Sequence, residues 1–306
     1  MIYTTTFNPA LDYIMKIRDF QTGEINHSET EYILPGGKGI NVSIVLKALE
    51  IDSKTLGFIA GFVGEEIEKR VKAYGIKTDF IPIENEISRI NVKMTTPLEE
   101  TAINTKGPYI GKSYLTLLYQ KIEKIQNGDV LVLSGSIPKG IPNNIYQDIC
   151  QKVEKKEVKI VVDATEDLLL KTLPYHPFLI KPNQEELEEI FQVKISSQEE
   201  AIEYAKKLKQ KGAQNVLVSM GSMGAILLDE NGKVYKREAL TRKKEVNTVG
   251  AGDSMVAGFI AGYQLFHNYE EAFEMGIAAA TATTNSTFLA TKEEIEQYFM
   301  QIKDKK

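Results

Sequence analysis

The stretch Asn247-Thr-Val-Gly-Ala-Gly-Asp253-Ser-Met-Val-Ala-Gly258 joins a tight glycine turn to a carboxylate and then to a helical pattern. Gly250 and Gly252 permit backbone conformations that larger residues resist, so successive N–H groups can converge at a helix N-terminus, where the helix dipole favours an anion. A carboxylate at Asp253, beside such an anion site, suits a base that takes a proton from an attacking hydroxyl. Aspartate is also a preferred helix N-cap, and the stretch alone leaves cap and base equally open.

Three other glycine-rich or polar clusters also lie where a strand-like segment meets a helical one: residues 36–41, 134–140 and 181–186. Short apolar runs such as 130–133 and 159–162 alternate with helical patterns along the chain, which is typical of a parallel sheet. Because the carboxyl ends of parallel strands share one edge, where ligands bind, these clusters are expected to meet there. The sequence therefore predicts an α/β fold with a mostly parallel sheet flanked by helices, and a ligand site at its edge.

A β-rich subset interrupts this alternation, with strand-like segments at 13–17, 29–34, 89–94 and 100–104. We expect these segments to pair as a small second sheet. Residues 1–306 would then form a single unit, in which a β lid is built from about 11–35 and 87–106 and the α/β core from the remainder. Elsewhere Asn231-Gly232 predicts a β-hairpin, and Ser197 with Glu200 and Thr291 with Glu294 predict helix starts.

Composition excludes several classes of function. The chain has 37 Lys and Arg against 42 Asp and Glu, a formal net charge of -5, so no nucleic-acid partner is indicated. Cys150 is the single cysteine, which rules out an internal disulfide or a cysteine metal cluster, and its helical apolar neighbours indicate packing. The sequence shows no apolar segment long enough to span a bilayer, and a cytoplasmic location is the default expectation.

Four motifs in order resemble those of a known family. Gly36-Gly37-Lys38-Gly39-Ile40-Asn41 and the stretch from Asn247 to Asp253 resemble the two signatures of the ribokinase-like carbohydrate kinase family, the phosphofructokinase B group. Lys181-Pro-Asn183-Gln-Glu-Glu186 looks like the family's Asn-x-x-Glu motif, and Ser134-Gly-Ser136-Ile-Pro resembles a sugar-side loop. The resemblance covers essentially the whole chain. The segments that look most like its bacterial 1-phosphofructokinase branch are Asn8-Pro9, Asp12, Arg89-Ile-Asn91-Val-Lys93 and Tyr175-His-Pro-Phe.

The resemblance implies a Rossmann-like core with a β-sheet lid, and an enzyme. The reaction that it implies is ATP-dependent phosphoryl transfer to the 6-hydroxyl of fructose 1-phosphate, giving fructose 1,6-bisphosphate and ADP. Tagatose 6-phosphate or fructose 6-phosphate is the alternative substrate within the same family, and a non-catalytic sugar-phosphate sensor is the alternative from another class. Relatives pair through the lid edge, so a homodimer through the β lid is also implied.

The resemblance also implies roles for particular residues. Asp253 would be the general base, and the N–H groups of Gly250, Ala251 and Gly252 would bind the transferred phosphoryl group. Glu186 and Asn183 would hold Mg²⁺, mostly through water. The sugar would lie against Asp12, Gly36, Gly37, Asn41 and Asn91, with Lys38, Arg89 and Ser136 as candidates for its phosphate, and the nucleotide against Lys181, Asn183, Ser219, Gly221 and Gly224.

The chain departs from the family pattern at the start of the second signature. Asn247 stands where the family usually has Asp, and Val249 where Thr is common. In potassium-dependent relatives that first carboxylate helps to bind the cation, so the departure argues against potassium activation. Without the family context, Arg89 would be taken for a solvated strand residue and Glu186 for part of an exposed acidic helix face.

Overall fold

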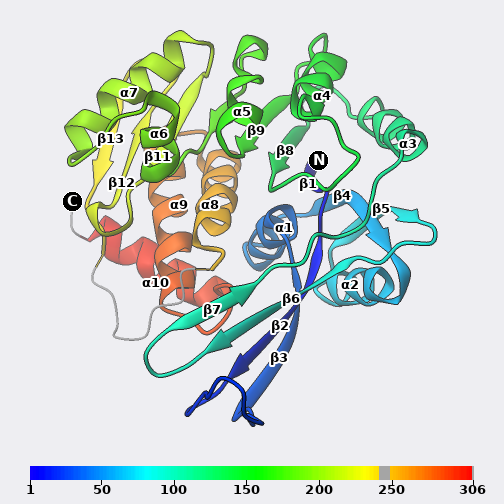
Figure 1. Cartoon of the computed structure of the whole chain (residues 1–306). Coiled ribbons are helices and arrows are strands. Elements are labelled where there is room, and N and C mark those ends of the chain that lie inside the picture. The colour runs from blue at the N-terminus through cyan, green and yellow to red at the C-terminus, as the bar shows by residue number, and fades with distance from the viewer. Residues whose placement is uncertain (241–248, 305–306) are drawn as a thin grey trace.

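The computed structural model describes residues 1–240 and 249–304, which form two β-sheets and the helices around them (Figure 1). The larger sheet has the order β13-β12-β11-β10-β9-β8-β1-β4-β5. All its pairs are parallel except those that join β11, β12 and β13. Its strands are β1 (Ile2–Thr6), β4 (Ser53–Ala60), β5 (Lys77–Ile83), β8 (Val130–Ser134), β9 (Lys159–Asp163), β10 (Leu179–Ile180), β11 (Asn215–Ser219), β12 (Ala225–Leu228) and β13 (Val234–Arg237).

Helices cover both faces of this sheet, as Figure 1 shows. Helices α1, α8, α9 and α10 pack on one face with α2 beside α1, and α3, α4, α6 and α7 pack on the other. Their bounds are α1 (Lys38–Ala48), α2 (Gly61–Ala73), α3 (Lys112–Ile122), α4 (Ile145–Val153), α5 (Glu166–Leu170), α6 (Gln184–Phe191), α7 (Gln198–Gln210), α8 (Ala251–Phe266), α9 (Tyr269–Thr284) and α10 (Lys292–Lys303). The predicted α/β fold is confirmed.

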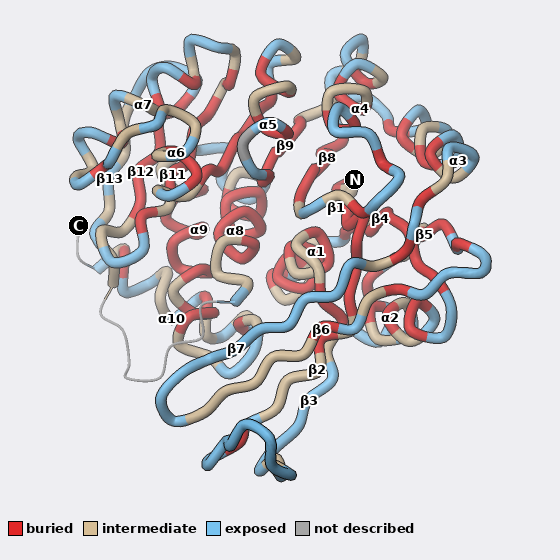
Figure 2. Tube along the Cα trace, viewed as in Figure 1, coloured by how far each residue is buried: buried red, intermediate tan, exposed pale blue. Residues whose placement is uncertain are grey.

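Burial on both faces explains why the central strands are continuously apolar. In β8, Leu131 and Leu133 belong to the core on one side of the sheet, and Val130 and Val132 belong to the core on the other. A strand with one solvated face would instead alternate apolar and polar residues. The tube coloured by burial shows the central strands almost wholly buried (Figure 2).

The smaller sheet is the predicted β-rich subset, and the prediction of a separate second sheet is confirmed. Its strands are β2 (Ala10–Lys16), β3 (Thr30–Gly36), β6 (Arg89–Thr95) and β7 (Glu100–Ile103), in the order β3-β2-β6-β7. The chain enters it directly after β1 and again after β5, so this sheet is inserted between elements of the core. Much of it is exposed or only half-buried, unlike the larger sheet (Figure 2).

Two local predictions hold and one holds in part. Asn231-Gly232 lies in the turn between the antiparallel strands β12 and β13, as a hairpin requires. Thr291 and Glu294 form a complete capping box at α10. At α7 the Ser197 side chain accepts the Glu200 N–H, but the Glu200 carboxylate accepts from Ser196 rather than from Ser197. Among the described residues, no helix has the length and apolar character needed to cross a bilayer.

Close packing of α8 against α9 fixes the helix that carries the glycine turn. At Gly258 an added Cβ would lie 2.5 Å from the Met275 carbonyl oxygen and 2.9 Å from Ala279 Cβ. Both Gly262 and Gly276 make similarly close approaches to the facing helix. Small residues are therefore required here because the two backbones come close together.

We expect Gly258→Ala to lower the free energy of unfolding by about 1–3 kcal/mol, because a methyl group overpacks a contact that neither helix backbone can relieve. Urea unfolding measures the change. Gly111→Ala is the matched control: Gly111 precedes α3 with φ -73, and an added Cβ there meets only Tyr114 Cδ2, at 3.9 Å. The control should stay within about 1 kcal/mol of the parent. Equal losses in both variants would contradict the packing argument.

Candidate active site

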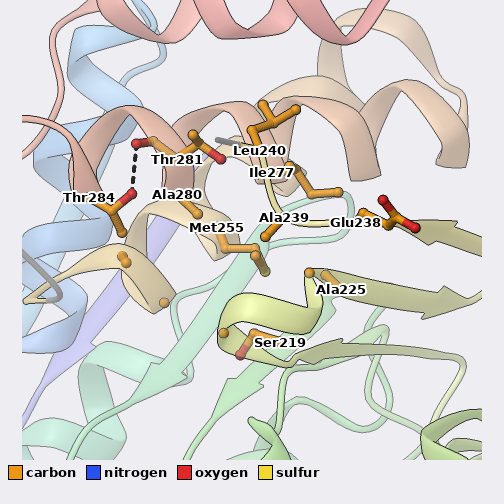
Figure 3. Close-up of a pocket in the computed structure, with 14 residues that line it drawn as sticks. Ser219, Ala225, Glu238, Ala239, Leu240, Met255, Ile277, Ala280, Thr281 and Thr284 are labelled. Atoms are coloured by element: carbon orange, nitrogen blue, oxygen red, sulfur yellow. Dashed lines mark hydrogen bonds between the residues drawn. The ribbon is translucent and has the colours of Figure 1, made fainter. Parts of the chain in front are cut away.

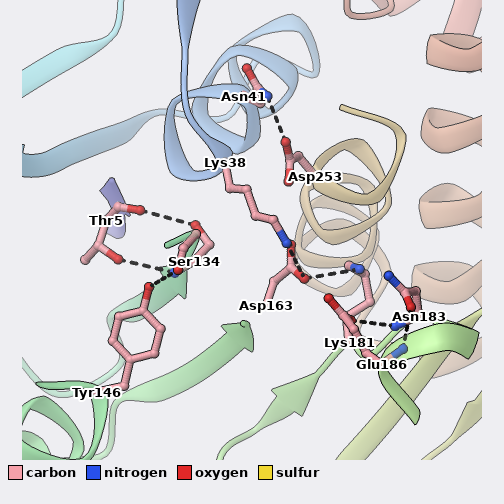
Figure 4. A network of polar contacts seen from close by, with 11 residues as sticks. Thr5, Lys38, Asn41, Ser134, Tyr146, Asp163, Lys181, Asn183, Glu186 and Asp253 are labelled. Atoms are coloured by element: carbon pink, nitrogen blue, oxygen red, sulfur yellow. Dashed lines mark hydrogen bonds and ion pairs between the residues drawn. The ribbon is translucent and has the colours of Figure 1, made fainter. Parts of the chain in front are cut away.

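The carboxyl ends of the central strands bring the predicted motifs together. The chain leaves β1, adds β4 and β5 on one side, and returns to place β8 on the other side of β1. Such a reversal leaves a crevice at the strand ends, which is where open α/β sheets bind ligands. Lys38 at the start of α1, Asp163 at the end of β9 and Lys181 just after β10 all lie there (Figure 4).

Asp163 is the centre of the polar network. Its side chain is only 1% exposed, and both its oxygens lie 3.3 Å from Lys38 Nζ. The side chain of Lys181 is also buried, and its Nζ lies 3.2 Å from Asp163 Oδ1. Burial alone would raise the pKa of Asp163, but Lys181 and Lys38 outweigh burial and lower it. Asp163 is therefore a charged carboxylate shared by two ammonium groups.

The glycine turn places Asp253 inside α8 rather than at its cap. Gly250 is the N-cap, in the left-handed conformation with φ 79, and Asp253 is the third residue of the helix. The N-cap interpretation of Asp253 is thus wrong, because the turn needs a positive φ at the cap position and glycine provides it. Instead Asp253 Oδ2 accepts a hydrogen bond of 2.7 Å from Asn41 Nδ2 (Figure 4).

Asp253 is almost fully buried, and this sets its acidity. Burial, with the negative charge of Asp163 as a further cause, raises the pKa of Asp253 to about 6, against the opposing effects of Lys38, Asn41 and Lys181. A carboxyl group with a pKa of about 6 is suited to exchange a proton near neutral pH. The geometry and the acidity of Asp253 both fit a general base.

The predicted sugar-side residues lie on and beside the smaller sheet. The Asp12 carboxylate accepts from Asn91 Nδ2 and from Lys93 Nζ, both at 2.8 Å. A Cβ on Gly36 would lie 2.5 Å from Asp12 Oδ2, so only glycine leaves room for this carboxylate. Gly37, with φ 129, lies between β3 of the smaller sheet and helix α1 of the core.

The three phosphate candidates do not lie together in one network. Arg89 Nε donates to the Asn8 carbonyl oxygen at 3.0 Å, close to Asp12. Lys38 instead points to Asp163. Ser136 is exposed in the turn after β8, where Ser134 is the buried residue and bonds to Thr5 (Figure 4).

A pocket opens beside the glycine turn. It has a cavity volume of about 210 Å³ and is lined by the predicted nucleotide residues Ser219, Gly221 and Gly224, together with Ala251 and Gly252 of the turn. Further lining residues include Glu238, Met255, Ile277, Thr281 and Thr284 (Figure 3). Lys181 Nζ would be 3.3 Å from a Cβ on Gly252, so this lysine ends at the turn.

The predicted magnesium residues form a capping box at α6. The Asn183 side-chain oxygen accepts the Glu186 N–H, and Glu186 Oε2 accepts the Asn183 N–H, both at 2.8 Å. Asn183 therefore orients Glu186, whose buried carboxylate faces the network of Figure 4. Among the described residues no group of three His, Cys, Asp or Glu is placed to hold a metal. One carboxylate fits an ion that keeps its waters and binds substrate phosphates, as Mg²⁺ does.

Two features of the site were missed by the sequence analysis. Asp163 directly follows the apolar run 159–162 and was not among the predicted site residues, although a carboxylate that ends an apolar strand at this edge is itself a signal. Pocket residues Thr281 and Thr284 come from α9, which follows the glycine turn in sequence without any motif of its own. The predicted departure at Asn247 lies outside the described residues.

Comparison with known proteins supports the resemblance. The family model described as pfkB family carbohydrate kinase matches residues 5–294. The chain is 42% identical to the 1-phosphofructokinase of Bacillus subtilis, over 99% of both chains, and 37% identical to the D-tagatose-1-phosphate kinase of Bacillus licheniformis, over 99% of this chain and 98% of that one. The structure of phosphofructokinase-2 from Escherichia coli in complex with substrates and products has a TM-score of 0.93 over 99% of both chains; at 24% identity this likeness concerns the fold alone.

The matched model spans nearly the whole described chain, and both relatives are kinases aligned over almost their full length. A kinase of this kind transfers a phosphoryl group from ATP to a sugar hydroxyl. The strand-end network, the glycine turn and the pocket beside it all lie within the matched residues. The chain belongs to the pfkB family of carbohydrate kinases.

Proposed function

We propose that the enzyme transfers the γ-phosphoryl group of ATP to the 6-hydroxyl of fructose 1-phosphate, giving fructose 1,6-bisphosphate and ADP. The observation that carries the proposal is the position of Asp253, which lies between the pocket lined by Ser219 and Gly252 and the sugar-side residue Asn41. The name of the Bacillus subtilis relative supports the choice of sugar.

The proposed reaction is a single in-line displacement. The 6-hydroxyl oxygen forms a bond to the γ-phosphorus as the bond to the bridging oxygen of ADP breaks, and the hydroxyl proton passes to an Asp253 oxygen. Asn41 would orient the base, because its side-chain amide donates a hydrogen bond to Asp253 Oδ2. The N–H groups at Gly250, Ala251 and Gly252 would bind the phosphoryl oxygens at the start of α8.

A magnesium ion, bound chiefly through water at Glu186, would supply charge that offsets the phosphates of ATP. Asn183 would keep the Glu186 carboxylate in place through the capping box. On the sugar side, Asp12 and Asn91 would bind hydroxyls, and Arg89 would bind the 1-phosphate, since a guanidinium pairs well with a dianion.

The smaller sheet would act as a lid over the sugar. Its face with Asp12, Asn91 and Lys93 carries the proposed sugar residues, and Tyr32 of β3 meets Phe288 of the core edge-on, with ring centroids 5.0 Å apart. The next residue, Leu289, fills the space beside Gly250. Closure of the lid would exclude water from the phosphoryl group during transfer.

The main alternative substrate is tagatose 1-phosphate, because a relative of 37% identity is named D-tagatose-1-phosphate kinase. The two sugars share the 1-phosphate and the 6-hydroxyl and differ in configuration at one carbon, so the same machinery serves both. A 6-phosphosugar would require the phosphate and the reacting hydroxyl to exchange ends. A non-catalytic sensor has no use for a buried base with a pKa of about 6.

A coupled assay of ADP release tests the substrate. We expect kcat/KM for fructose 1-phosphate to exceed that for fructose 6-phosphate, tagatose 6-phosphate and unphosphorylated fructose, each by at least about tenfold, because Arg89 and Asp253 are fixed at opposite ends of the sugar. Tagatose 1-phosphate has the same groups at both ends, so the ratio of its kcat/KM to that of fructose 1-phosphate decides between these two substrates. Preference for a 6-phosphosugar would overturn the proposed orientation, and the absence of turnover with every sugar would support the sensor.

We further propose that the enzyme is a homodimer formed through the lid. On the face opposite Asp12, a row of apolar or aromatic side chains crosses the smaller sheet: Ile33, Tyr13, Val92 and Ile103. Ile103 is 59% exposed and Ile33 37%, so water reaches apolar surface that a second copy would cover.

Light scattering at micromolar protein should give a mass of about twice the 34.3 kDa of one chain. Ile103→Lys should shift the mass towards that of a monomer, because it puts a charge into the proposed contact. The exposed apolar residue Leu117, in α3 of the core, gives the control variant Leu117→Lys, which should leave the mass unchanged. A parent protein that is monomeric under these conditions would refute the proposal.

A further inference from the structure

Lys38 Nζ ends beside Asp163, close to Asp253, whereas Arg89 lies beside Asn8 and Asp12. Resting on the proposed function, we propose that Lys38 is a catalytic residue that binds the transferred phosphoryl group together with Lys181, and that Asp163 is the positioning residue that holds both lysines. The sequence alone had made Lys38 a candidate for the resident phosphate of the sugar.

The Lys38 side chain runs from the start of α1 to the end of β9. Lys38 is the first residue of α1, and its Cβ lies 3.8 Å from the ideal Cβ position of Gly135, just past the end of β8. From there the chain reaches the end of β9, where Nζ lies 3.3 Å from both Asp163 oxygens. Figure 4 shows the Lys38 side chain extended from α1 to Asp163, with Asp253 nearby.

Two lysines, Lys38 and Lys181, converge on the carboxylate of Asp163. Lys181 comes from a different motif, yet its Nζ lies 3.2 Å from Asp163 Oδ1 and beside Gly252 of the anion turn. Two ammonium groups so close together repel each other, and the carboxylate between them offsets the repulsion. Together the two lysines and Asp163 carry a net positive charge next to the N–H groups of the turn. This charge suits the binding of a phosphoryl group with its three oxygens.

Lys38 is separated from Arg89, the candidate for the phosphate that the sugar already carries. The 1-phosphate and the 6-hydroxyl lie at opposite ends of the sugar. Groups beside Asp253 would therefore lie near the 6-hydroxyl and not near the 1-phosphate. Burial lowers the pKa of Lys38, but Asp163, Asp253 and Glu186 outweigh burial and raise it, as expected for an ammonium close to all three carboxylates. Arg89 lies elsewhere, bound to the Asn8 carbonyl and near Asp12.

The proposed role of Lys38 adds no proton transfer to the reaction. Lys38 stays an ammonium throughout: it donates hydrogen bonds to the non-bridging oxygens while the bond from the 6-hydroxyl oxygen to phosphorus forms and the bond to ADP breaks. The proton still passes from the hydroxyl to Asp253. Because the charge on these oxygens is arranged differently in the transition state than in the bound substrates, loss of Lys38 should affect kcat more than substrate binding.

Steady-state kinetics of Lys38→Met in the full-length enzyme test the inference. We expect kcat to fall by about 10²- to 10³-fold while the KM for the phosphosugar changes by less than about threefold. Lys38→Arg, which keeps the charge, should recover part of the lost kcat. Lys47→Met is the control: Lys47 lies in the same helix but pairs with Asp52 at the surface, and its loss should leave both constants unchanged. A tenfold or greater rise in the phosphosugar KM with unchanged kcat would return Lys38 to the resident phosphate.

Dependence on pH separates a positioning role of Asp163 from a merely structural one. The charge of Lys38 lowers the pKa of Asp253 and the charge of Asp163 raises it, so Lys38→Met should move the acidic limb of kcat/KM to higher pH and Asp163→Asn to lower pH. Shifts in the same direction, or none in either variant, would overturn the arrangement.

Any phosphosugar that the parent enzyme turns over serves for these measurements. A change of substrate therefore alters the proposed function and leaves this test intact. A parent enzyme inactive with every phosphosugar would overturn both.

Discussion

The arrangement of the site depends on one buried carboxylate that holds two lysines. Asp163 ends β9 with its side chain out of solvent, where a lone charge would be costly, and Lys38 and Lys181 compensate it from two sides. One lysine opens α1 and the other follows β10. These ion pairs therefore set the start of a helix and the end of a strand at fixed places around the crevice.

The parallel sheet and the close packing of α8 on α9 supply the rest of the geometry. Strand ends deliver polar residues to a single edge, and the glycine at 258 lets α8 approach α9 closely enough to place the turn at 250–252 opposite that edge. We propose that the pocket beside the turn binds the nucleotide and that the smaller sheet binds the sugar. In this account residues 250–253 and the lysine pair govern transfer, while the smaller sheet selects the sugar.

Sequence patterns predicted the fold because the signals were local and repeated: apolar runs between helical stripes, the Asn231-Gly232 turn, and the capping pair at Thr291. The candidate residues Asn41 and Asp253 were named from motifs, and the structure brings them within hydrogen-bonding distance. The sequence could not show where a long, flexible side chain ends. Lys38 lies in a motif assigned to the sugar, but a lysine reaches several ångströms, and only the path past Gly135 shows that it ends at Asp163.

The central claim is that Asp253 accepts the proton from the attacking hydroxyl, and the pH dependence of kcat/KM for the parent enzyme and for Asp253→Asn tests it most directly. Because burial raises the pKa of Asp253 to about 6, the carboxylate form is lost as pH falls through that value. The account predicts that kcat/KM of the parent falls about tenfold per unit below about pH 6, and that Asp253→Asn loses about 10²- to 10⁴-fold in kcat together with this limb. A parent profile that is flat between about pH 5 and 8, or an Asp253→Asn variant with near-parental kcat, would contradict it.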